Sequence, residues 1–268
     1  MKNKKKIKIL VIIFIIILII LIFIYGKIIQ KHLINRRMVN NFIEISKNNE
    51  EQVFKIEKII LCSSANAIDR SEEKNLQDLD IYQYTDIAVY IDNGEELSNK
   101  NTIKKLYIDN ISLEGNDEFG NKSLKYKNLL EFGLKQEILD ENIDSKENIE
   151  FNIIYTNEEN EKANYNDPTF YTDCSNPITL QYVNYNLVNG YKLNENESVS
   201  FDGNILKATG INSKDIDCKV KFKINLINNQ NEKYSCWINF KIPLDDIYDG
   251  TTMKYRTTKG SKYIFFRE

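Results

Sequence analysis

The side chains that most often carry nucleophilic or metal chemistry are scarce in this chain of 268 residues. Its single histidine, His32, precedes residue 51, so the remainder has no imidazole to activate a serine or cysteine or to bind zinc. The glycine-rich motifs that hold phosphates are also missing from the sequence. We therefore predict that the chain is not an enzyme and has no catalytic residue, cofactor or metal site.

Carboxylates are the remaining candidates for chemistry, and they gather at residues 114–118 and 245–249. Calcium needs several oxygen ligands, but neither segment has the alternating order of an EF-hand loop. Solvated turns are the simpler interpretation of both. Two carboxylates brought together in space could still cleave a glycosidic bond, so a carboxylate-dependent cell-envelope hydrolase is the alternative to a non-catalytic protein.

The four cysteines, Cys62, Cys174, Cys218 and Cys236, include no Cys-x-x-Cys pair, which argues against a zinc cluster. An even number outside the cytoplasm permits disulfides. In the hairpin predicted below, Cys236 lies opposite about Lys223, and five residues of strand at about 3.3 Å each separate it from Cys218, too far for a bond. Cys62 and Cys174 are therefore the candidate disulfide participants, and four buried thiols are the alternative.

An uninterrupted apolar segment at residues 9–25 determines where the rest of the chain lies. Its roughly 17 residues rise about 26 Å as a helix, close to the ~30 Å hydrocarbon core of a bilayer. No small-residue cleavage site follows, so an uncleaved transmembrane helix at 9–26 is favoured over a signal peptide. The lysine-rich residues 1–8 predict a cytoplasmic tail, which places the body of this single-pass protein outside the cell membrane.

The next segment, residues 27–50, keeps helical spacing and predicts a juxtamembrane helix or stalk. Residues 51–268 carry 26 basic and 37 acidic side chains, a net charge of −11. Nucleic acid is therefore not an expected partner, because binding its phosphates requires clustered lysine and arginine. Residues with A/T-rich codons are abundant and Pro (3) and Gly (10) are scarce, which indicates a low-GC bacterium.

From residue 51 the hydrophobic pattern changes from helical to alternating. At residues 53–62 the more apolar face includes Phe54, Ile56, Ile60 and Cys62. Many short alternating segments separated by turn residues predict an all-β, β-sandwich-like ectodomain. The polar run at 158–167 is the candidate boundary between two subdomains, a β-rich one at 51–160 and a β-sandwich-like one at 168–268.

The clearest single element is an antiparallel hairpin at residues 219–242. Apolar side chains on both of its strands alternate with polar ones and predict its buried face: Val220, Phe222, Ile224, Leu226, Tyr234, Cys236, Ile238, Phe240 and Ile242. Trp237 falls on the opposite face, toward solvent. There it either covers a sheet edge or marks a contact surface.

Together these features predict a membrane-anchored protein whose extracytoplasmic β-rich module binds or scaffolds without catalysis. The expected partners are the membrane, which it spans once, and an envelope protein or polysaccharide. Besides the envelope hydrolase, the remaining alternative is an accessory or sensor subunit of a membrane complex. Such a subunit would need a partner, because a cytoplasmic tail of about eight residues cannot carry a domain of its own.

Overall fold

The computed structural model describes eight segments of the chain: residues 53–71, 76–94, 98–127, 148–154, 169–171, 177–194, 198–257 and 263–268. Several predicted features lie outside them: the tail at 1–8, the transmembrane helix at 9–26, the juxtamembrane segment at 27–50, the boundary at 158–167 and Cys174. Val53–Glu268 form a compact unit. Within the described segments, no helix has the length and apolar character needed to cross a membrane.

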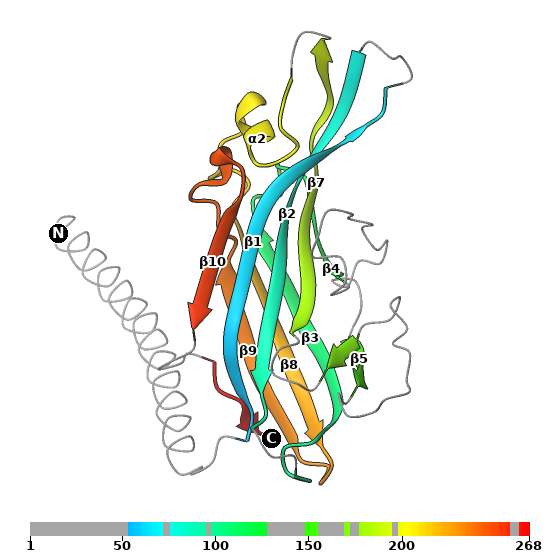
Figure 1. The fold of residues 1–268 in the computed structure, drawn as a ribbon, viewed down its shortest axis with the longest axis vertical. Helices are drawn as coiled ribbons and strands as arrows, with labels where there is room; N and C mark the ends of the chain where they lie inside the picture. The colour runs from blue at the N-terminus through cyan, green and yellow to red at the C-terminus, as the bar shows by residue number, and fades with distance from the viewer. Residues whose placement is uncertain are drawn as a thin grey trace, which may run out of the picture. The chain divides into compact units, whose positions relative to one another are not determined.

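The described residues form two β-sheets with almost no helix, which confirms the all-β prediction (Figure 1). The first sheet has the strand order β10-β1-β2-β7-β4. Its strands are β1 (Lys55–Asp69), β2 (Leu76–Asp92), β4 (Asn121–Tyr126), β7 (Ile178–Asn194) and β10 (Thr252–Thr257). All of its pairings are antiparallel.

The second sheet has the order β11-β9-β8-β3-β5-β6. Its strands are β3 (Ile103–Gly115), β5 (Asn148–Ile154), β6 (Thr169–Tyr171), β8 (Cys218–Asn228), β9 (Lys233–Lys241) and β11 (Phe266–Arg267). Only β5 and β6 pair in parallel among these strands. Strands on the two sides of the predicted boundary pair with each other, since β2 pairs with β7 and β3 with β8.

Buried residues of both sheets belong to one hydrophobic cluster. Ile59 and Leu61 of β1 and Tyr182 of β7 join it from the first sheet, and Ile108 of β3 and Phe222 of β8 from the second. Each of these side chains is fully buried. Burying a side chain of this size contributes about 1.5–3 kcal/mol, so this cluster accounts for much of the stability that fixes the strand register.

The buried face predicted for the start of β1 is correct at Phe54 and Ile56 but wrong beyond them. A register shift between Ile56 and Lys58 marks a β-bulge in the pairing of β1 with β2. The extra residue reverses the alternation, because two residues of the bulged strand oppose one on its partner. Ile59 and Leu61 are therefore fully buried, whereas Ile60 and Cys62 are only partly buried.

The hairpin predicted at residues 219–242 is confirmed as β8 and β9, paired from Lys219↔Lys241 to Ile227↔Lys233. The turn is centred on Gln230 as predicted, but Cys236 lies opposite Ile224, one residue from the predicted partner Lys223. The Asn228 side chain fixes this turn, because its Oδ1 accepts hydrogen bonds from the backbone N–H groups of Gln230 and Glu232. Asparagine is frequent in turns because its side chain can accept hydrogen bonds from backbone N–H groups close to it in the chain.

A small second cluster of apolar residues surrounds the short helices α2 (Asn204–Ala208) and η2 (Ile247–Asp249). The backbones of these two elements approach closely at Gly203, whose N–H donates to the carbonyl of Gly250 at 2.7 Å. A Cβ atom at Gly203 would lie 1.8 Å from the carbonyl oxygen of Ile247, so only glycine allows this approach. The contact fixes the segment that connects β9 to β10.

Candidate functional site

The outward face of the β8–β9 hairpin displays the only tryptophan of the chain. Trp237 is 43 % exposed, whereas its neighbours in β9, Cys236 and Ile238, are buried. Successive side chains of a strand point to opposite faces, so the burial of these neighbours fixes Trp237 toward solvent. We call this outward side the Trp237 face; it consists of Lys219, Lys221 and Lys223 of β8 and Trp237, Asn239 and Lys241 of β9.

Trp237 makes a cation–π contact with a lysine of the neighbouring strand. The register pairs Trp237 with Lys223 and Asn239 with Lys221, which makes Lys221 the diagonal neighbour of the tryptophan. Its Nζ lies 4.5 Å from the centroid of the indole ring. A cation in this position is attracted to the ring, by about 0.5–1 kcal/mol at an exposed site. The contact places an ammonium group beside the ring.

The other lysines of the Trp237 face are held by carboxylates. Three ion pairs do this: Lys219–Glu114 at 3.6 Å, Lys223–Glu268 at 2.6 Å and Lys241–Asp217. The hydrogen bond from Lys223 holds the pKa of the Glu268 carboxyl below its ordinary value. The face therefore offers many hydrogen-bonding groups but little net charge.

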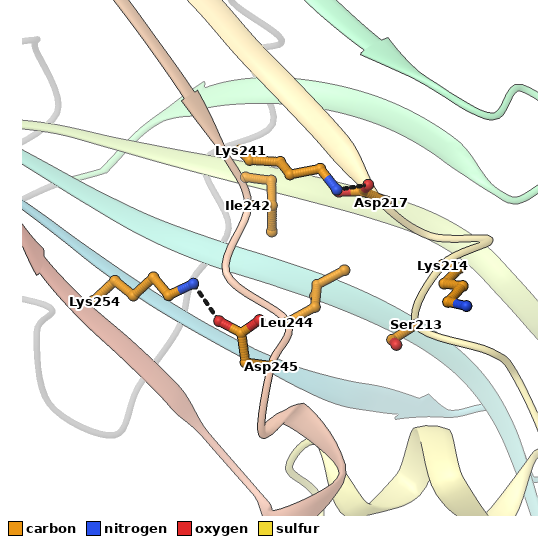
Figure 2. Close-up of a pocket in the computed structure, with 8 residues that line it drawn as sticks. All are labelled: Ser213, Lys214, Asp217, Lys241, Ile242, Leu244, Asp245 and Lys254. Atoms are coloured by element: carbon orange, nitrogen blue, oxygen red, sulfur yellow. Dashed lines mark ion pairs between the residues drawn. The ribbon is translucent and has the colours of Figure 1, made fainter.

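A pocket of about 410 Å³ lies where β9 ends, and Lys241 belongs both to it and to the Trp237 face. Figure 2 shows the two ion pairs of the pocket, Lys241–Asp217 and Lys254–Asp245, with the Leu244 side chain between them. Lys254 belongs to β10, so strands of both sheets contribute to the lining. Trp237 and Lys241 are four residues apart in β9, or about 13 Å at 3.3 Å per residue.

The chemistry of the pocket is set by its ion pairs. The hydrogen bond and the positive charge of Lys254 lower the pKa of the Asp245 carboxyl. Asp245 is therefore ionised at neutral pH, so it can accept hydrogen bonds but cannot serve as a general acid. Asp245 belongs to the acidic segment that the sequence analysis singled out. The sequence did not predict that Asp217 and Lys254 line the same pocket, because they come from separate parts of the chain.

The two acidic segments do not form metal sites in the described part of the chain. No group of three or more His, Cys, Asp or Glu side chains is arranged there to hold a metal ion. Glu114 pairs with Lys219, and Asp117 with Lys122 at 3.6 Å. Lysine partners thus neutralise carboxylates in both segments.

Among the described residues, Cys62, Cys218 and Cys236 form no disulfide bond with one another. Burial raises the pKa of Cys236 to about 12 and that of Cys218 to about 11. Burial and the neighbouring Asp86 carboxylate raise the pKa of Cys62 as well. The reactive form of cysteine is the thiolate, so these thiols are poor nucleophiles at neutral pH. A disulfide through Cys62 or Cys174 stays a prediction.

One buried ion pair in the first sheet had no signal in the sequence pattern. Lys127 Nζ lies 2.5 Å from Asp86 Oδ2, and Gln181 Nε2 donates to Asp86 Oδ1 at 2.8 Å. Strand pairing places Asp86 between Cys62 of β1 and Gln181 of β7. Because the lysine and the carboxylate neutralise each other, this group stabilises the sheet and is not a candidate binding site.

Comparisons of the chain with protein-family models, with curated proteins and with solved structures find no match. The Trp237 face offers one aromatic ring among hydrogen-bonding side chains, and the adjoining pocket offers two ion pairs beside an apolar side chain. This arrangement can bind a polar ligand that also has an apolar surface.

Proposed function

We propose that this protein is anchored in the cell membrane by a single helix at residues 9–26, with its β-rich body outside the cell. The body binds a component of the cell envelope through the Trp237 face, without catalysis. The apolar length of the segment and the lysine-rich tail before it support the anchor and its orientation.

The main support for binding is the exposure of the Trp237 side chain to solvent. Burying apolar surface is favourable by about 25 cal/mol per Å². A partner that covers the exposed indole ring would therefore gain binding free energy. Tryptophan is enriched in binding surfaces, where a partner removes the ring from water. Here the ring is 43 % exposed, and the Lys221 ammonium lies 4.5 Å from its centroid.

We also infer that the two sheets pack face to face as a β-sandwich. The support is the single hydrophobic cluster with members from both sheets. In a sandwich, the inner faces share one core and the outer faces meet solvent. Such packing holds the Trp237 face rigid and directs it outward.

A carboxylate-dependent envelope hydrolase and a sensor or accessory subunit stay predictions from the sequence. Hydrolysis requires a protonated carboxyl near a second carboxylate. In the pocket, Lys254 keeps Asp245 ionised at neutral pH. The hydrogen-bonding groups of the pocket favour binding over proton transfer.

The proposal is tested by co-sedimentation of the full chain, in detergent micelles, with purified envelope fragments from the source cells. We expect the wild-type chain to sediment with the fragments and Trp237→Ala to stay in solution. Phe201→Ala is the matched control, because Phe201 is also an exposed aromatic residue, at 48 %, but lies outside the hairpin. Equal sedimentation of Trp237→Ala and wild type, or no sedimentation of either, contradicts the proposal.

A further inference from the structure

We infer that the ligand of the Trp237 face is a polysaccharide chain with little net charge, which extends along β9 from Trp237 to the pocket between Lys241 and Lys254. This inference rests on the proposed binding function and names the class of its ligand. Three properties of the face support it: its charge balance, its single aromatic ring and its distance from the pocket.

The charge balance argues against a polyanionic ligand. Three lysines of the face are each paired with a carboxylate of this same chain, which leaves Lys221 over the indole ring. A polyanion gains most of its affinity when clustered, unpaired cations of the protein replace its bound counterions, which are released into solvent. Paired lysines and carboxylates instead offer donors and acceptors side by side. Sugar hydroxyl groups, which both donate and accept hydrogen bonds, complement such a surface.

The single exposed aromatic ring of the hairpin favours a sugar over a protein partner. Four large hydrophobic side chains are exposed in the described residues, namely Ile68, Phe201, Trp237 and Met253, and Trp237 alone belongs to β8 or β9. A stable protein interface buries roughly 800 Å² on each partner around a core that is depleted of charge. Phe266 of β11 also lies on this side, because it pairs with Ser235 of β9, but it is only partly exposed. One exposed ring among ion pairs does not provide that core. One ring is enough to cover the apolar C–H face of one sugar unit.

The pocket supplies a second contact along the same direction. Its volume of about 410 Å³ falls in the range of small-ligand sites, which is about 300–1,000 Å³. Leu244 gives it an apolar surface between two ion pairs, so its chemistry resembles that of the Trp237 face (Figure 2). Because about 13 Å separates Trp237 from Lys241 along β9, a linear chain of a few sugar units can reach both.

The test uses the full chain in detergent micelles and the fluorescence of Trp237, which reports only this face because the chain has no other tryptophan. The first probe is envelope polysaccharide stripped of protein by protease, and the second is dextran sulfate as a polyanion. We expect stripped polysaccharide to change the emission saturably and dextran sulfate to leave it unchanged. In calorimetry, Trp237→Ala lowers the affinity at least about tenfold, and Trp237→Phe, which keeps a stacking ring, by less than about threefold.

Lys254→Gln tests the pocket and should lower the affinity about threefold, whereas Phe201→Ala should not change it. Binding to untreated envelope that is lost after protease treatment identifies a protein partner, which overturns this inference but leaves the proposed function standing. Binding of dextran sulfate that weakens with salt and ignores Trp237→Ala also overturns it. Absence of binding even to untreated envelope overturns both.

Discussion

Gln83 offers a prediction whose sign is opposite to that of most substitutions in a protein core. The side chain is 0 % exposed, and neither its Nε2 nor its Oε1 has a hydrogen-bond partner in the described part of the chain. A buried polar group without a partner costs about 1–3 kcal/mol. Methionine has a similar length and no such requirement. We therefore expect Gln83→Met to raise the free energy of unfolding by about 1–3 kcal/mol.

Gln181 is the matched control, because the same substitution there should have the opposite effect. Gln181 is also buried, at 5 %, but its Nε2 donates to the Asp86 carboxylate at 2.8 Å. Hydrogen bonds to charged groups contribute about 1.5–3 kcal/mol, so Gln181→Met should lower the free energy of unfolding by about that amount. The two variants make the same substitution at buried positions in two strands of one sheet, and the two sites differ in whether the glutamine amide is hydrogen-bonded.

Urea unfolding of the full chain in detergent, followed by far-UV circular dichroism, measures both variants. Each 1 kcal/mol also shifts the melting temperature by about 2–4 °C for a body of this size, which gives an independent readout. A loss of stability in Gln83→Met comparable to that in Gln181→Met would refute the reasoning. It would mean that the Gln83 amide is hydrogen-bonded after all.

Three further outcomes are expected. Asp86→Asn should lower the free energy of unfolding by about 3–5 kcal/mol because it removes the carboxylate that pairs with the buried Lys127 ammonium and accepts from Gln181. Replacing both Asp86 and Lys127 by apolar residues should recover most of the loss in the same urea experiment. Alkylation of Cys236 should be slow in the folded chain at pH 8 and complete in denaturant, because burial raises its pKa to about 12; equal rates would contradict this. In an NMR titration the Glu268 carboxyl should have a pKa below its ordinary value, and Lys223→Met should raise it. The stability from this pair is present above the unfolded pKa of about 4.3 and is lost as the pH falls through the lower folded pKa, so a pKa unchanged by the substitution would contradict the ion pair.

The β8–β9 hairpin was predictable because its information is local. The alternation from Val220 to Ile242 fixes both faces, and burial of the apolar face then fixes the register. Trp237 breaks the alternation of polar residues, which is why its exposure could be anticipated. The register makes Lys221 a diagonal neighbour of the ring, which places the lysine within reach of the contact seen in the structure.

The rest of the candidate site could not be predicted, because it depends on contacts between distant segments. Asp217, Lys241, Asp245 and Lys254 surround one pocket only after strands of two sheets are in place. The bulge after Ile56 was not predicted either. Ile59, Ile60 and Leu61 are all apolar, so the sequence alone does not show which face of the strand is buried beyond Ile56. Local patterns therefore determine strands, whereas sites and bulges depend on pairing.

The claim that the β-rich body lies outside the cell underlies the proposed ligand class, and it can be tested directly. The measurement is protease accessibility of an epitope tag placed after Glu268, in intact cells and in cells whose membrane has been opened. We expect external protease to remove the tag from intact cells while a cytoplasmic control protein survives. If the tag survives until the membrane is opened, the body lies in the cytoplasm, and both the orientation of the anchor and the envelope ligand are wrong.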